Sequence, residues 1–194
     1  MIYGAVFSWG DDTDSSEELN EQISRLAYGD RSGKFVSYMA KTAECSIFDW
    51  WDANVVYEEK VLGHPNNRNA LFDARIQDEA KRAAAYETIA ALKKELKKTA
   101  GKLEESCRPM VPVLELTMDA INLWNETGAR LCDIELGKEK DEAACAALAG
   151  RLESWFMKYK ASWRSISKEG DLHHIAEIVF WYADILRGRK PYEK

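Results

Sequence analysis

The chain has 194 residues, of which 46% are hydrophobic and 31% are charged, a balance typical of a soluble globular protein. Its formal net charge is −6 and it contains no Lys/Arg run of the kind that nucleic acids or anionic membranes need, so we expect neither as a partner. No apolar run approaches the ~20 residues that a membrane-spanning helix needs.

The cysteines and histidines show no metal-binding spacing. They are Cys45, Cys107, Cys132, Cys145, His64, His173 and His174. The cysteines fall within apparent helices and form no CxxC pair, which is typical of small buried apolar residues in a reducing compartment. The first residues also lack the basic start and long apolar stretch of a signal peptide. We therefore expect a cytoplasmic protein without a metal or a cofactor.

The first element expected along the chain is a short strand from Tyr3 to Ser8, which is followed directly by Trp9-Gly10-Asp11-Asp12. A single strand is only marginally stable in water, and the rest of the sequence offers almost no other strand. We therefore interpret residues 3–8 as an orphan strand that belongs to a larger protein.

Helical patterns fill the remainder of the sequence. The first is predicted over residues 14–29, because Asp14 or the following Ser can cap it and apolar residues recur at helical spacing up to Gly29. The second covers about residues 34–60, with a break near Cys45.

Four further helices are predicted in the second half of the chain. They cover residues 70–102, a stretch from Pro109 or Pro112 to Gly137, residues 139–166, and residues 171–186 with Asp171 as the cap. Helices of about 25 to 30 residues joined by short turns are typical of an up-and-down bundle. The predicted fold class is all-α, a bundle of long helices preceded by the orphan strand. Residues 1–29, the strand and the first helix, are expected to be the remnant of another domain of the larger protein, and residues 30–190 form the bundle domain.

The candidate binding residues are Trp9, Asp11 and Asp12, which directly follow the predicted strand. A Trp side chain offers a flat apolar face, and carboxylates beside it accept hydrogen bonds from hydroxyl groups. Together these groups suit a sugar ring, and Gly10 lets the backbone turn sharply between them. The alternative is structural: Trp9 packs on its own domain, and the two Asp form a turn and a helix cap.

Other clusters are interpreted structurally. Asp78-Glu79 and Asp141-Glu142 could act as acid and base at a glycosidic bond, but both pairs lie on Lys-rich helical surfaces typical of a solvated face. Asn125-Glu126-Thr127 fits the glycosylation sequon by chance. The aromatic groups Trp50-Trp51 and Phe180-Trp181-Tyr182 indicate a bundle core or an interface rather than a groove.

Residues 7–12, Phe-Ser-Trp-Gly-Asp-Asp, resemble the last barrel strand of family 20 glycoside hydrolases, the β-N-acetylhexosaminidases. Several bacterial members share Trp-Gly-Asp-Asp here and carry a large helical domain after the barrel. Residues 63–73 resemble a segment inside that domain. The resemblance implies that Trp9 lines the pocket for a terminal N-acetylhexosamine and that Asp11 binds its hydroxyls, with Asp12 as a further candidate.

The sequence departs from the family in one decisive respect, because it contains no Gly-Gly-Asp-Glu, the motif that carries the catalytic pair. The resemblance therefore implies the end of a (β/α)8 barrel plus a C-terminal accessory domain of an exo-β-N-acetylhexosaminidase, with no catalytic residue of its own. Its partners would be the N-terminal barrel and, in a homodimer, a second copy. The alternatives are a free-standing helical interaction module and a glycosidase of another family.

Overall fold

The computed structural model describes residues 15–65, 70–72, 74–166 and 170–189. Within these ranges the α-helices are α2 (Ser16–Tyr28), α3 (Phe35–Glu44), α4 (Trp50–Tyr57), α5 (Ala74–Gln77), α6 (Glu79–Thr99), α7 (Met110–Glu135), α8 (Glu142–Ile166) and α9 (Leu172–Leu186). The prediction of an all-α bundle is confirmed for this part of the chain. The predicted strand, Tyr3 to Ser8, lies outside the described residues.

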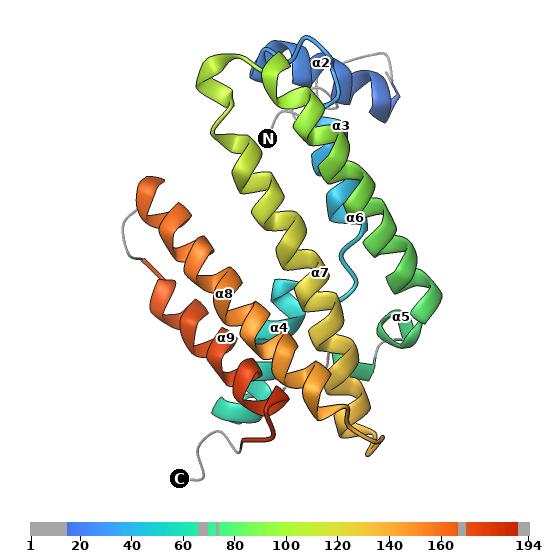
Figure 1. Cartoon of the computed structure of the whole chain (residues 1–194), viewed down its shortest axis with the longest axis vertical. Helices are drawn as coiled ribbons and strands as arrows, with labels where there is room; N and C mark the ends of the chain where they lie inside the picture. Colours follow the sequence, from blue (N-terminus) through green and yellow to red (C-terminus); the bar gives the residue numbers. More distant parts are fainter. Residues whose placement is uncertain (1–14, 66–69, 73, 167–169, 190–194) are drawn as a thin grey trace.

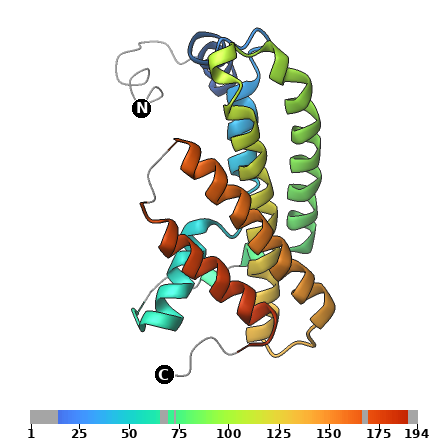
Figure 2. The ribbon, with the colours of Figure 1, turned by 60° about the vertical axis from the view of Figure 1, so that its left-hand side comes forward.

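The helices form two groups that share α7. In one half of the molecule, α3, α6 and α7 run along the long axis, and α2 lies across their end (Figures 1 and 2). In the other half, α8 and α9 form an antiparallel hairpin that packs obliquely on α7, and α4 lies against α9 and α7. One buried apolar cluster runs through both groups.

The helix ends follow local chemistry. The Ser15 hydroxyl accepts a hydrogen bond from the Glu18 backbone N–H, and the Glu18 carboxylate accepts one from the Ser15 N–H, which is a capping box at the start of α2. The helix ends at Gly29, whose φ of 54° is left-handed. Asp171 also occupies the cap position predicted for α9, but its side chain makes no cap hydrogen bond.

Two long helical stretches are interrupted. The predicted break near Cys45 is confirmed, since α3 ends at Glu44 and α4 starts at Trp50. The prediction of one continuous helix over residues 70–102 is wrong. Asp78 adopts an extended backbone with ψ of 96°, and its carboxylate accepts a hydrogen bond from the Lys81 N–H at 2.9 Å, so Asp78 caps a new helix, α6.

The segment between α3 and α4 is held by one side chain of α7. The Oδ1 atom of Asn125 accepts hydrogen bonds from the backbone N–H groups of Ile47 (2.8 Å) and Phe48 (3.1 Å), and its Nδ2 donates to the Cys45 carbonyl (2.8 Å). Asn125 is 1% exposed. A buried backbone N–H without a partner costs about 1–3 kcal/mol. The Asn125 side chain avoids this cost because it supplies the hydrogen bonds that a regular helix would otherwise provide.

A glycine one turn further along α7 completes this contact. The Phe48 side chain is fully buried against Gly128, where a Cβ atom would lie 2.5 Å from the Phe48 Cγ. Asn125 and Gly128 are three residues apart and therefore share one face of α7. Together they let the chain between α3 and α4 approach the α7 backbone.

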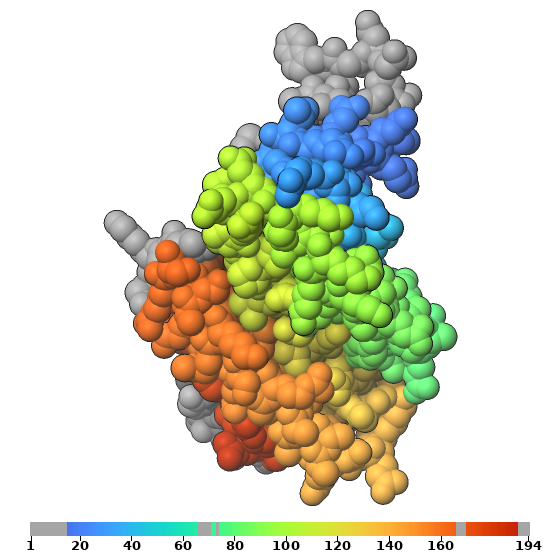
Figure 3. Space-filling model, turned by 45° about the horizontal axis from the view of Figure 1, so that its top comes forward, coloured from blue at the N-terminus to red at the C-terminus, as the bar shows by residue number. Residues whose placement is uncertain are grey.

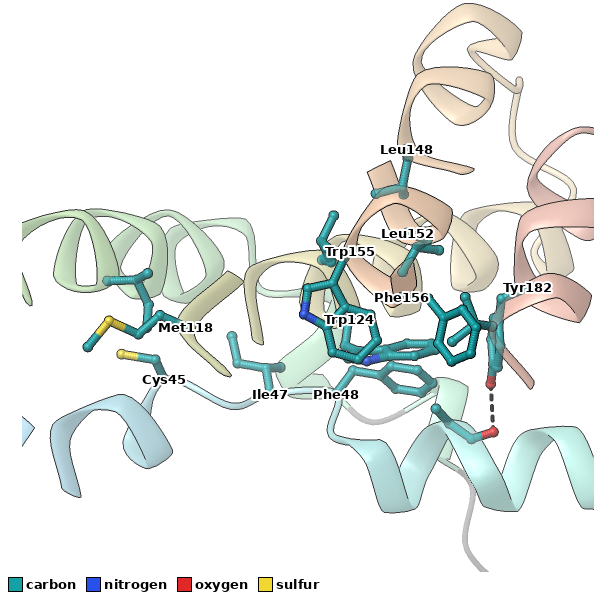
Figure 4. Packing of buried hydrophobic residues seen from close by; sticks show 14 of the residues in the cluster. Cys45, Ile47, Phe48, Met118, Trp124, Leu148, Leu152, Trp155, Phe156 and Tyr182 are labelled. Atoms are coloured by element: carbon teal, nitrogen blue, oxygen red, sulfur yellow. Dashed lines mark hydrogen bonds between the residues drawn. The ribbon is translucent and has the colours of Figure 1, made fainter. Parts of the chain in front are cut away.

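The junction of α8, α9 and α4 is apolar and aromatic. Phe48, Trp124, Phe156 and Tyr182 converge there, and the Tyr182 hydroxyl donates a hydrogen bond to the Ala53 carbonyl at 2.9 Å (Figure 4). Burial, and then the charge of Asp52, raise the pKa of Tyr182 well above its ordinary value.

An ion pair joins α8 to α9 at the edge of this junction. The Arg187 guanidinium donates two hydrogen bonds to the Glu153 carboxylate, at 2.5 and 2.7 Å. These bonds lower the pKa of Glu153.

The helix α2 packs on α3 through a small separate cluster. Leu19 and Ile23 contact Val36, and the Ser24 hydroxyl accepts a hydrogen bond from the Val36 N–H at 2.9 Å. Backbone hydrogen bonds link the turn after α2 to residues 102–104, which connect α6 to α7. The space-filling view shows α2 lying against that connection (Figure 3).

We predict that Gly128→Ala and Gly150→Ala have opposite effects on stability. A Cβ added at position 128 would clash with Phe48, so we expect a loss of about 1–3 kcal/mol in the free energy of unfolding. A Cβ at position 150 meets nothing within 4 Å, so Gly150→Ala in α8 should gain about 0.5–1 kcal/mol from helix propensity. Urea unfolding followed by circular dichroism measures both; stabilisation by Gly128→Ala would contradict the close approach.

Candidate functional site

The predicted sugar-binding residues, Trp9, Asp11 and Asp12, lie outside the described residues. The described part of the chain contains a different candidate, a cleft of about 420 Å³ between α7 and α8 that we call the aromatic groove. Its aromatic lining is Phe48, Trp50, Trp124, Trp155, Tyr159 and Trp163; the rest is Ser46, Asp49, Val113, Leu116, Thr117, Ala120, Ile121, Ser162 and Ile175.

One wall of the aromatic groove is a ladder of rings on α8. Trp155, Tyr159 and Trp163 recur every fourth residue and therefore share a helix face. The Trp155 and Tyr159 rings stack with centroids 5.2 Å apart and planes at 23°, and the Tyr159 and Trp163 rings follow at 5.8 Å and 36°. The Tyr159 ring therefore lies between the other two rings of this ladder, stacked on Trp155 and tilted against Trp163.

The opposite wall is formed by smaller side chains of α7, among them Val113, Thr117 and Ala120. The C-terminal half of α8 diverges from the N-terminal half of α7 in both ribbon views (Figures 1 and 2). The Trp155 indole N–H spans the two helices at the base of this divergence and donates to the Leu116 carbonyl at 3.0 Å. The groove therefore occupies the wedge between two helices that separate beyond this hydrogen bond.

The floor of the aromatic groove comes from the segment that Asn125 holds. Phe48 is buried there, and the Trp50 ring meets the Trp124 ring edge-on, at 5.7 Å and 70°. Trp51 is 60% exposed and does not line the groove. The interpretation of Trp50-Trp51 as core or interface rather than groove is corrected for Trp50, which packs on the core and also lines the groove. Trp51 points elsewhere because adjacent helical residues face different directions, and an interface role for it stays a prediction.

The predicted cluster at residues 180–182 is also divided. Trp181 and Tyr182 are buried in the core, as the interpretation required, whereas Phe180 is exposed. The Phe180 ring contacts Phe156 on α8. These residues do not line the aromatic groove.

The polar groups of the groove are few, and two of them are already hydrogen-bonded within the helices. Besides the Trp155 indole, the Thr117 hydroxyl donates to the Val113 carbonyl at 3.0 Å. Burial raises the pKa of Tyr159, so its phenol is neutral at physiological pH. Asp49, whose carboxylate caps α4, is the one acidic residue among the described residues that line the groove.

The predicted acidic pairs lie on the surface, away from the aromatic groove. Asp78 caps α6, and the Asp141 carboxylate accepts a hydrogen bond from the Ala144 N–H at 2.9 Å at the start of α8. Their neighbours Glu79 and Glu142 are exposed. The interpretation of these pairs as a solvated face is confirmed, and Asp78 and Asp141 each cap a helix.

The cysteines, His174 and the sequon residue Asn125 also have no arrangement typical of a functional site in the described part of the chain. The four cysteines are free, and burial raises the pKa of Cys45, Cys132 and Cys145. His174 Nε2 lies 2.9 Å from the Asn54 Oδ1. No three His, Cys, Asp or Glu residues are grouped for a metal ion in the described ranges. Asn125, which fits the glycosylation sequon, is buried and uses both polar side-chain atoms internally.

Comparisons with known proteins find no similarity. No protein-family model matches the chain, and neither a curated protein nor a solved structure matches it significantly. None of the helices in the described ranges combines the length and the apolar composition needed to cross a membrane.

We predict that the aromatic ladder stabilises the α8 wall through the Tyr159 ring and not through its hydroxyl. Tyr159→Ala removes two ring contacts, each worth about 0.5–1.5 kcal/mol, and should lower the free energy of unfolding by about 1–2 kcal/mol. It should also weaken the near-ultraviolet circular dichroism of the stacked rings. Tyr159→Phe keeps the ring and should change stability by less than about 0.5 kcal/mol. Equal stability of Tyr159→Ala and wild type would contradict the stacking.

Proposed function

We propose that this chain is the C-terminal helical accessory domain of a bacterial, cytoplasmic exo-β-N-acetylhexosaminidase, an enzyme that removes terminal N-acetylhexosamine from glycans. The observation that carries the proposal is the sequence Phe-Ser-Trp-Gly-Asp-Asp at residues 7–12, placed one helix ahead of an all-helical domain. The resemblance to family 20 glycoside hydrolases implies this order of elements. The helical architecture after residue 15 supports it.

The surface of α2 gives further support. Leu19, Ile23 and Leu26 form one apolar stripe at helical spacing. The first two pack on α3, whereas Leu26 is 86% exposed. In the proposed parent, α2 directly follows the last barrel strand, so the barrel is placed to cover the end of the stripe that α3 leaves open.

The roles follow from the resemblance. Trp9 would stack on the sugar ring, Asp11 would accept hydrogen bonds from its hydroxyls, and Asp12 would assist. The barrel would supply the acid and the acetamido-orienting carboxylate, so the chain alone would not be catalytic. The helical domain would support the barrel, wall one side of its cleft or form a homodimer interface.

The first test is the coding DNA upstream of the Met1 codon. We expect an open frame that encodes alternating strands and helices and a Gly-Gly-Asp-Glu motif. In the encoded protein, Asp11→Asn should lower kcat/KM on a chromogenic N-acetylglucosaminide by about 10- to 100-fold, because a hydrogen bond to a charged group contributes about 1.5–3 kcal/mol. Trp9→Ala should lower kcat/KM as well, because it removes the face on which the sugar ring stacks. The exposed Trp51 offers a control, since Trp51→Ala should leave kcat/KM unchanged.

The same assay on the isolated 194-residue chain should show no turnover above a denatured sample. Turnover by the clean chain would contradict an accessory role. A stop codon and ribosome-binding site just ahead of Met1 would contradict the barrel connection and favour the free-standing interaction module.

A further inference from the structure

The aromatic groove carries charge of only one sign. Among its described lining residues Asp49 is the single charged one, and none is Lys, Arg or His, although the chain has 27 Lys and Arg in total. The faces of aromatic rings also carry negative electrostatic potential. The carboxylate and the rings therefore favour a positive ligand and disfavour an anion.

The Asp49 carboxylate retains capacity for a ligand. Its Oδ1 accepts the α4 cap hydrogen bond from the Asp52 N–H at 2.8 Å, but a carboxylate offers about four acceptor positions on two oxygens. Asp49 is exposed, and no Lys, Arg or His of the described chain forms a salt bridge with it. A ligand cation can therefore approach Asp49 without displacing an internal ion pair.

The ring geometry disfavours a sugar stacked on Tyr159, whose ring lies between those of Trp155 and Trp163 along α8. The volume of about 420 Å³ falls in the range of small-molecule pockets, about 300–1,000 Å³, and the apolar lining with few polar groups is typical of such sites.

We propose that the aromatic groove binds a small organic cation, an ammonium group with an apolar aryl or alkyl body. The ammonium group lies beside Asp49 and the adjacent, half-buried Trp50, where carboxylate attraction and cation–π attraction act together. The apolar body lies in the wedge between α7 and the α8 ladder. A quaternary ammonium suits the site because its weakly held hydration shell costs little to remove, and the Asp49 charge attracts it without a hydrogen bond. This site is independent of the hexosaminidase proposal.

The test compares three probes that share a benzyl group and differ in charge, on the full chain: benzyltrimethylammonium, benzyl alcohol and benzylsulfonate. Isothermal titration calorimetry gives the affinities, and methyl resonances of labelled protein give the location. We expect the cation to bind at least about tenfold more tightly than either other probe. It should shift the methyl signals of Ile121 and Ile175, which line the groove, and leave that of Ile89, a core residue of α6, unchanged.

Two substitutions of matched chemistry test the role of Asp49. Asp49→Asn keeps a good helix cap and removes only the charge, so it should weaken benzyltrimethylammonium about five- to tenfold and leave benzyl alcohol unchanged. Asp78→Asn makes the same change at the cap of α6, outside the groove, and should alter neither affinity. Ala120→Phe fills the wedge and should abolish binding of all three probes.

Equal affinities for the cation and the neutral probe would overturn the proposal, as would cation binding that Asp49→Asn leaves unchanged. Absence of benzyltrimethylammonium binding, or binding that shifts Ile89 but neither Ile121 nor Ile175, would overturn it as well. If Ala120→Phe fails to fold, the comparison of Asp49→Asn with its control Asp78→Asn still tests whether the Asp49 charge binds the cation.

Discussion

The fold depends on the three hydrogen bonds that the Asn125 side chain makes with the backbone of residues 45–48. Cys45 and Ser46 still donate to carbonyls at the end of α3, but the N–H groups of the buried residues Ile47 and Phe48 have the Asn125 side chain as their acceptor. Two buried N–H groups without partners would cost about 1–3 kcal/mol each, a large part of the stability of an ordinary domain. The amide removes that cost, and Gly128 on the same face of α7 leaves room for the Phe48 ring.

The aromatic groove follows from this constraint. Because the 45–48 segment is fixed on α7, α4 starts beside the groove, and its first two residues, Asp49 as cap and Trp50, become the charged rim and part of the floor. Trp155 sets the other side, since its hydrogen bond to Leu116 marks where α8 leaves α7. The site is therefore built on long helices and on one anchored turn, which suits a preformed pocket.

Much of the fold is predictable because long amphipathic helices have a strong periodic pattern. The bounds of α7, α8 and α9 follow from apolar spacing with Pro, Gly and Asp at their ends. The break at Asp78 could not be predicted in this way. The residues on both sides of Asp78 favour a helix, so the sequence does not distinguish a helix N-cap from an acidic residue inside one continuous helix. Asn125 stands out in the sequence only as a sequon, although a Gly three residues later on the same helix face indicates a close backbone approach.

The aromatic groove could not be predicted, because it depends on the angle at which α8 diverges from α7, and spacing along the chain does not determine that angle. The ladder residues Trp155, Tyr159 and Trp163 share a helix face by their spacing alone, but the same spacing is typical of a closed core. The sequence prediction of a sugar site falls on Trp9, Asp11 and Asp12, outside the described residues, and stays a prediction.

Native-state amide hydrogen exchange tests the central claim about Asn125 most directly. If the Asn125 side chain pairs the N–H groups of Ile47 and Phe48, these two amides exchange as slowly as amides in the middle of α7, such as Leu123, although they lie outside regular helix. In Asn125→Ala the protection of Ile47 and Phe48 should be lost before that of Leu123. Exchange of Ile47 and Phe48 in the wild type at the rate of Glu139, in the exposed turn before α8, would contradict the account.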